Sequence, residues 1–111
     1  MKTLKILFVE NHSIFAQQAI AHFLSAHQVT VVPSLSTARS SLSTDQFDLL
    51  LVDYDLDDGK GEELVRDLRQ AGNKIRIIGV SAREEGNAAL LHAGVDAICS
   101  KMEFNRIQEL I

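Results

Sequence analysis

Five apolar runs, each about the length of a β-strand, alternate along the chain with segments that have helical features. The runs cover residues 4–9, 29–32, 47–52, 75–80 and 95–99. Short runs that are mostly apolar suit strands buried on both faces, and strands that alternate with helices are typical of parallel sheets. The pattern therefore predicts an α/β fold, with a doubly wound five-stranded parallel sheet and helices on both faces.

The first three helical segments show different signals. Residues 13–27 have one apolar face, with Ser13 or Asn11 available as the N-terminal cap. Residues 36–43 form a polar second helix. The third helix begins with two glutamates and carries arginines near its end, which suits the helix dipole, and Gly72 terminates it.

The last two helical segments contain features that weaken or shorten a helix. Residues 83–93 include Gly86, which costs about 1 kcal/mol relative to alanine and predicts a mobile element. A fifth helix is expected to begin near Glu103 or Phe104, and the sequence stops at Ile111 after barely two turns. We expect this last helix to be truncated.

Size and composition suit one domain spanning residues 1–111. The chain has 46% hydrophobic residues and a formal net charge of −4, enough apolar material for one modest core. Its one cysteine, Cys99, lies in an apolar run and is expected to be buried. With a single cysteine, no disulfide can form within the chain.

The chain also lacks the usual signals for membranes and nucleic acids. The first residues pass directly into strand-like sequence without the apolar core of a secretory signal. No apolar run approaches the roughly 18 residues of a membrane-spanning helix, and no basic patch suggests nucleic-acid binding. We expect a cytoplasmic protein with neither a membrane nor a nucleic acid as a direct partner.

Polar residues follow four of the five predicted strands. In the sheet order 2-1-3-4-5, as in flavodoxin-like folds, the ends of the first and third strands are neighbours, so Glu10, Asn11 and Asp53 converge. Hard oxygen ligands with room for water and phosphate oxygens suit Mg²⁺. Ser81 after the fourth strand and Lys101 after the fifth add a hydroxyl and a cation, which suits phosphoryl transfer to Asp53.

This ordered set resembles the bacterial response-regulator receiver domain of two-component phosphorelays over essentially the whole chain. The matching segments are Glu10-Asn11, the loop 53–61 (DYDLDDGKG), Ser81-Ala82 and Lys101. The resemblance implies a conformational switch rather than an enzyme. It also implies that Ser81 and Lys101 contact the phosphoryl group.

The resemblance further implies how the other site residues act. Asp53 is then the phosphoacceptor, phosphorylated with Mg²⁺ by a sensor histidine kinase or phosphotransfer protein. Glu10 and Asn11 correspond to the acidic pair that helps hold the metal, and Asp55 to a residue that lends its backbone carbonyl. A downstream effector domain or protein and a homodimer are both compatible with the family.

Three positions depart from the family pattern. Asn11 replaces an acidic metal ligand, so we expect weaker Mg²⁺ binding rather than none. Ile98 replaces the switch aromatic, and Met102 replaces the proline that usually follows the lysine. These departures leave open a second interpretation, a receiver-like interaction module that takes no phosphate.

Other residues near the predicted site have simpler explanations. Asp57 and Asp58 precede Gly59 and are expected to shape the turn into the third helix rather than bind metal. His12, near the start of the first helix, is expected to be an ordinary surface residue.

Two further function classes share part of the pattern. The Asp53-Tyr54-Asp55 segment matches the motif of haloacid-dehalogenase-like phosphohydrolases, but that motif normally ends the first strand of a longer chain. A flavodoxin-like flavin binder would have a hydroxyl- and glycine-rich loop where this chain has acidic Glu10. Both rank below the receiver interpretation.

Overall fold

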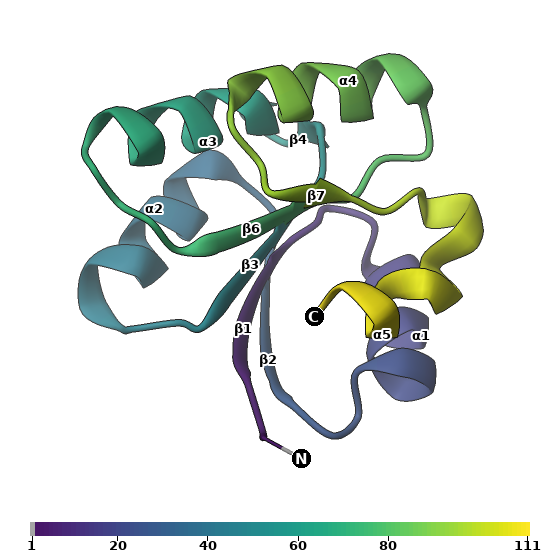
Figure 1. Cartoon of the computed structure of the whole chain (residues 1–111). Coiled ribbons are helices and arrows are strands. Elements are labelled where there is room, and N and C mark those ends of the chain that lie inside the picture. Colours follow the sequence, from purple (N-terminus) through teal and green to yellow (C-terminus); the bar gives the residue numbers. More distant parts are fainter. Residues whose placement is uncertain (1) are drawn as a thin grey trace.

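The molecule is built on a five-stranded parallel sheet, shown by a computed structural model that describes residues 2–111 (Figure 1). The strand order is β2-β1-β3-β6-β7. The strands are β1 (Lys5–Val9), β2 (Gln28–Val32), β3 (Leu49–Val52), β6 (Arg76–Gly79) and β7 (Ala97–Ile98). This order is the predicted 2-1-3-4-5 topology, because β6 and β7 are the fourth and fifth strands of this sheet. A small antiparallel hairpin, β4 (Asp55–Leu56) with β5 (Gly59–Lys60), follows β3 and was not predicted.

Helices cover both faces of the sheet, as predicted. The helices are α1 (Ser13–Phe23), α2 (Leu35–Thr44), α3 (Gly61–Gln70), α4 (Glu84–Ala93) and α5 (Ile107–Leu110). One core packs α2, α3 and α4 against one face of the sheet, and the other core packs α1 and α5 against the opposite face. Among residues 2–111, no helix is both long and apolar enough to cross a membrane.

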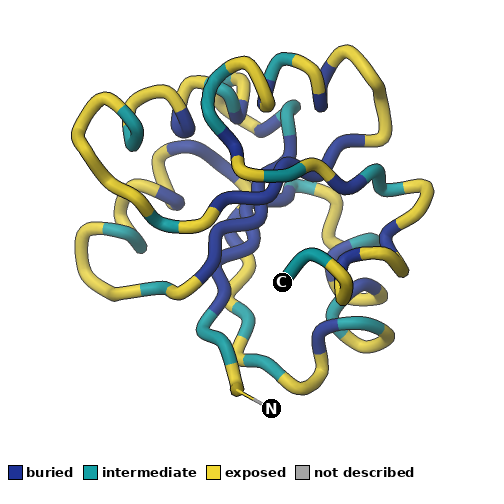
Figure 2. Tube along the Cα trace, in the orientation of Figure 1, coloured by how far each residue is buried: buried dark blue, intermediate teal, exposed yellow. Residues whose placement is uncertain are grey.

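The alternation of side chains along the central strands explains why most residues in these runs are apolar. In β1, Leu7 and Val9 enter the core beneath α2, α3 and α4, whereas Ile6 and Phe8 enter the core beneath α1 and α5. Successive strand residues point to opposite faces, so a strand buried on both faces needs apolar residues at nearly every position. Figure 2 shows the central strands buried along most of their length.

The structure confirms Ser13 as the start of the predicted first helix and corrects its C-terminal end and its capping residue. Helix α1 ends at Phe23 rather than His27, and the imidazole Nδ1 of His27 accepts a hydrogen bond of 3.0 Å from the Leu4 backbone N–H. The capping residue is His12, whose side chain forms no capping hydrogen bond, so the prediction of Ser13 or Asn11 was wrong. Instead, the Glu10 carboxylate accepts the His12 N–H at 3.1 Å.

Helix α2 is capped from two directions. Ser34 and Thr37 form a reciprocal capping box. The carboxylate of Asp58, in the turn between β4 and β5, accepts the N–H groups of Leu35 and Ser36 at 2.6 and 3.0 Å. Asp58 therefore joins the loop after β3 to the start of α2, rather than shaping only the turn into α3.

These two hydrogen bonds predict a pH-dependent contribution of Asp58 to stability. They lower the pKa of the Asp58 carboxyl below its ordinary 3.8. Because the folded-state pKa is depressed, the stabilisation is present above the unfolded pKa and is lost as pH falls through the folded one. Thermal unfolding of Asp58→Ala should show a lower midpoint than wild type at pH 7 and a shrinking difference at acidic pH. A difference that does not change with pH would contradict this.

The C-terminal helical region also differs from the prediction. A 3₁₀ segment, Lys101–Arg106, precedes α5, so the helix expected from Glu103 or Phe104 begins earlier and in a tighter form. Ser100 caps this segment by accepting the Met102 N–H at 3.2 Å. Lys101 is therefore the first residue of the 3₁₀ segment that follows β7.

Candidate functional site

Three of the predicted site residues meet at the carboxyl edge of the sheet. The Nζ atom of Lys101 lies 2.8 Å from each carboxylate oxygen of Glu10 and 3.1 Å from Oδ2 of Asp53. Glu10 and Asp53 follow β1 and β3, which are neighbours in register, and their N–H groups donate to Val32 and Val9 respectively. The doubly wound topology thus gathers residues that are 48 and 91 positions apart in the sequence.

This charged cluster is largely shielded from water. The side chains of Glu10, Asp53 and Lys101 are 0%, 7% and 11% exposed. Burial raises the pKa of the Glu10 carboxyl above its ordinary 4.5, the hydrogen bond from Lys101 opposes the rise, and the charge of Asp53 adds to it. With all three ionised, the cluster carries one net negative charge in a shielded place.

Lys101 is positioned by a ring as well as by carboxylates. Its Nζ lies 4.9 Å from the centroid of the Phe15 ring, where a cation–π attraction adds to the two ion pairs. Its backbone N–H donates to the Ser81 carbonyl at 3.1 Å. Phe15 belongs to α1, a helix that the sequence analysis did not connect with the site.

Ser81 is held by a residue that the sequence interpretation missed. Buried Asn87, in α4, accepts the Ser81 N–H at 3.0 Å through Oδ1 and donates from Nδ2 to the Ser81 carbonyl at 3.1 Å. The Ser81 Oγ accepts the Arg83 N–H at 3.2 Å, so its hydroxyl hydrogen remains available for a ligand. The sequence did carry a signal for this role. Asn87 lies three residues before the apolar Leu90, so the predicted helix places both on its inward face.

Two glycines allow the backbone to pack closely around this site. A Cβ on Gly86 would lie 2.5 Å from the Ser81 Oγ, which explains a glycine inside α4. The helix continues without a break through this residue. A Cβ on Gly61, the first residue of α3, would lie 2.0 Å from the Asp53 carbonyl oxygen. The sequence interpretation treated neither glycine as part of the site.

The other two predicted metal residues have different surroundings. The Nδ2 atom of Asn11 donates to Oδ1 of Asp57 at 3.3 Å. The side chain of Asp55 forms ion pairs with Lys60 and Arg83, the latter at 2.8 Å, at the exposed rim. The structure therefore joins Glu10, Asp53 and Lys101 directly and leaves Asn11 and Asp55 beside them.

The donor set fits a small divalent cation in part. Among residues 2–111, no three histidine, cysteine, aspartate or glutamate side chains form a metal-binding group. Two carboxylates are in place, however, and the buried Oε1 of Glu10 has no hydrogen-bond partner beyond its ion-pair contact with Lys101. Such an oxygen suits a cation, and with the amide oxygen of Asn11 the available donors are the hard oxygens that Mg²⁺ takes.

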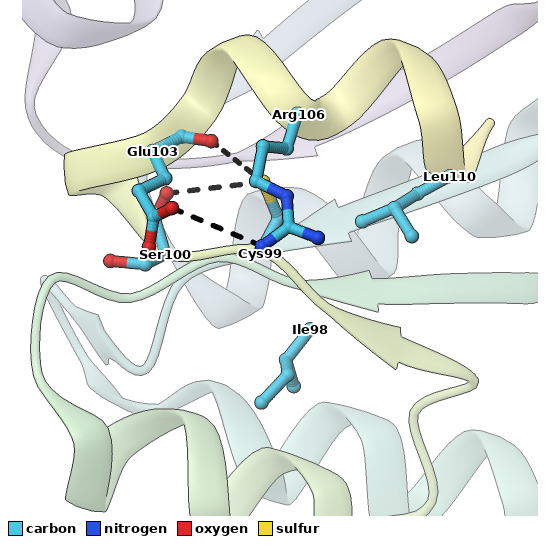
Figure 3. Close-up of a pocket in the computed structure, with 6 residues that line it drawn as sticks. All are labelled: Ile98, Cys99, Ser100, Glu103, Arg106 and Leu110. Carbon is cyan, nitrogen blue, oxygen red and sulfur yellow. Dashed lines mark hydrogen bonds and ion pairs between the residues drawn. The ribbon is translucent and has the colours of Figure 1, made fainter.

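Ile98 and Cys99 line a small pocket to which the charged cluster contributes no residue. The pocket is lined by residues of β7 and the C-terminal helical region (Figure 3): Ile98, Cys99, Ser100, Glu103, Arg106 and Leu110. Cys99 is 4% exposed and burial raises the pKa of its thiol, which confirms the expected buried cysteine. Ile98 is 40% exposed, so the position of the expected switch aromatic faces partly outward.

Comparison with known proteins agrees with the fold. The family model of the response regulator receiver domain matches residues 6–111. The KDP operon transcriptional regulatory protein KdpE of Escherichia coli (strain K12) is 35% identical over 104 residues, which cover 86% of this chain and 44% of KdpE. The chain thus spans less than half the length of this curated relative.

Solved structures show the same fold at lower identity. The receiver domain of the Francisella response regulator 1452 has a TM-score of 0.86 at 20% identity, covering 97% of this chain and 93% of that one. The receiver domain of the sensor histidine kinase PA1611 from Pseudomonas aeruginosa PAO1 has a TM-score of 0.81 at 24% identity, covering 98% and 97%. That structure holds a magnesium ion in its active-site cleft.

The family model covers nearly the whole chain, and KdpE exceeds 30% identity across most of it. The resemblance inferred from the sequence is therefore confirmed. This chain belongs to the response regulator receiver domain family, whose members are phosphoaccepting modules of two-component signal transduction.

Proposed function

We propose that Asp53 is the phosphoacceptor of this receiver domain and that Glu10, Lys101 and Ser81 assist the transfer. The observation that carries the proposal is the buried contact of one ammonium with two carboxylates at the carboxyl edge of the sheet. A carboxylate nucleophile with a fixed cation beside it suits phosphoryl transfer, where catalysis is mostly positioning and charge neutralisation.

In the proposed reaction, a carboxylate oxygen of Asp53 attacks the phosphorus of a partner's phosphohistidine. The new O–P bond forms as the P–N bond breaks, and the released imidazole nitrogen takes a proton. The Tyr54 N–H already donates to Oδ1 of Asp53 at 2.7 Å, which orients the carboxylate. Lys101 balances charge on the phosphorylated side chain, and the free hydroxyl hydrogen of Ser81 donates to a phosphoryl oxygen.

Mg²⁺ is the proposed cofactor, held by the carboxylates of Glu10 and Asp53, the amide oxygen of Asn11 and the backbone carbonyl of Asp55. When bound, it would supply positive charge to the phosphoryl oxygens. The buried Oε1 of Glu10, which accepts no hydrogen bond, supports this assignment. The phosphodonor would be a histidine kinase or a phosphotransfer protein, and the output an attached or separate effector.

Intact-mass measurement after incubation with acetyl phosphate and Mg²⁺ tests the proposal. Wild type should gain one labile phosphoryl group of about 80 Da, because acetate leaves as the carboxylate attacks. Asp53→Asn should gain none, since an amide is a poor nucleophile. Asp45→Asn should react like wild type, because Asp45 pairs with Lys5 near the start of β1, away from the carboxyl edge.

The same experiment separates the phosphoacceptor from a phosphorylation-independent interaction module. Folded wild type that gains no mass with either acetyl phosphate or a phosphorylated histidine partner would support the interaction module. Turnover of phosphate esters would instead support the phosphohydrolase alternative. The buried contact of Lys101 with Asp53 favours the phosphoacceptor.

The amide at position 11 predicts a site that a single substitution strengthens. Asn11→Asp adds one formal negative charge beside Glu10, so titration calorimetry should show Mg²⁺ binding about tenfold tighter than in wild type. Asn73→Asp, which adds the same charge just before β6 at the opposite end of the sheet, serves as the control. Equal affinities in all three proteins would show that residue 11 does not contact the cation.

A further inference from the structure

Asp57 is the hydrogen-bond partner of the one neutral residue in the proposed metal site. Its Oδ1 accepts from Nδ2 of Asn11 at 3.3 Å. An ionised carboxylate only accepts hydrogen bonds, and an amide donates only from its nitrogen. The contact therefore fixes which end of the Asn11 amide faces Asp57, and leaves Oδ1 of Asn11 as the free end.

The position of Asp57 is set by groups outside the charged cluster. Its backbone N–H donates to the Pro33 carbonyl at 3.3 Å, just after β2. The adjacent Asp58 carboxylate accepts two N–H groups at the start of α2. Asp57 itself is exposed, and these hydrogen bonds of its own backbone and of Asp58 hold the Asp57 side chain next to Asn11.

We propose that Asp57 is a positioning residue for the divalent cation, and this inference rests on the function proposed above. By holding the amide nitrogen of Asn11, it turns Oδ1 toward the metal, because Mg²⁺ accepts oxygen ligands and is repelled by an amide NH₂. Hydrogen-bond partners of metal ligands commonly have this role.

Calorimetric titration with Mg²⁺ alone measures this role without phosphorylation. Asp57→Asn should weaken Mg²⁺ binding about tenfold, since an asparagine accepts or donates equally and no longer fixes the Asn11 amide. Asp45→Asn, an equal loss of charge near the start of β1, should bind Mg²⁺ like wild type. Thermal unfolding without Mg²⁺ should be unchanged by Asp57→Asn, because both side chains are at least partly exposed.

A swap of the two residues separates orientation from general charge. In Asn11→Asp/Asp57→Asn the amide again donates to a carboxylate, now in the reverse direction, and the total charge is preserved. Asp57→Asn should then change the Mg²⁺ affinity of the Asn11→Asp protein by less than about twofold. The swapped protein should bind Mg²⁺ at least as tightly as wild type.

Three results would overturn the inference. Wild-type affinity in Asp57→Asn would show that the contact has no influence on the cation. An equal loss on adding Asp57→Asn to wild type and to the Asn11→Asp protein would show that Asp57 acts through charge alone and does not orient the amide. An absence of Mg²⁺ binding in every protein, Asn11→Asp included, would overturn the proposed metal role itself, and this inference with it.

Discussion

Lys101→Met should destabilise the protein by about 3–5 kcal/mol at neutral pH, the usual cost of removing one partner from a buried ion pair. The substitution keeps the apolar stem and removes the ammonium that contacts Glu10 and Asp53. The two carboxylates, 0% and 7% exposed, then face each other without a cation. Urea unfolding of the metal-free protein measures the change in free energy.

The loss should depend on pH, because the ammonium normally opposes the rise in the pKa of Glu10. Without it, that pKa rises further above the unfolded value. A raised folded-state pKa makes ionisation of a carboxyl oppose folding, so the destabilisation is present above the folded pKa and shrinks as pH falls toward 4.5. The double variant Lys101→Met/Glu10→Gln should regain part of the stability at pH 7.

Lys5→Met is the matched control, because Lys5 pairs with Asp45 where the two side chains are 38% and 52% exposed. Solvent screens such a pair, so this variant should unfold much like wild type. If Lys101→Met is as stable as Lys5→Met, the buried ammonium does not compensate the carboxylates. The charge argument for the site would then fail.

Gly61→Ala should cost at least about 3 kcal/mol, above the usual range for an added methyl group in a packed site. The new Cβ would lie 2.0 Å from the Asp53 carbonyl oxygen and 3.0 Å from Cγ2 of Val52. The first neighbour is a backbone atom of Asp53 and cannot move without shifting that residue, the proposed phosphoacceptor. Helix propensity alone predicts the opposite sign, since alanine is favoured over glycine in a helix by about 1 kcal/mol.

Gly72→Ala separates this close approach from the general effects of replacing glycine. Gly72 has φ +82° and no heavy atom within 4 Å of the place that an added methyl group would occupy, so its substitution costs only about 1–2 kcal/mol of backbone strain. Urea unfolding of both variants makes the comparison. A Gly61→Ala protein that is as stable as wild type would mean that α3 can move away from Asp53 freely.

The strands and the sheet order could be predicted from the sequence because local patterns encode them. A strand buried on both faces must be apolar at nearly every position, so the apolar residues Leu49 to Val52 predict a buried strand. The topology then places Glu10 and Asp53 at neighbouring strand ends. The helix ends were predicted less accurately. Helix α1 ends at Phe23, and His27, which we expected inside it, instead accepts a hydrogen bond from the distant Leu4 N–H.

The sequence indicated Glu10, Asp53, Ser81 and Lys101 as candidates, since each is a polar residue within two positions of the end of an apolar run. It did not indicate their arrangement. Whether an ammonium lies between two carboxylates depends on how the Lys101 turn packs against Phe15 of α1, and no local periodicity reports that contact. The amide of Asn87 behind Ser81 likewise becomes visible only when α4 is placed on the sheet.

The sequence pattern thus determined the fold, the family and the edge of the sheet where the candidate site lies. Consecutive residues show which strands are buried, and the direction of those strands shows at which edge the polar residues gather. The tertiary structure decided the contacts that give the site its properties: the buried ion pairs, the close approach at Gly61 and the link from Asp57 to Asn11. Such contacts join segments far apart in the chain. Their distances follow from the packing of whole elements rather than from any single stretch of residues.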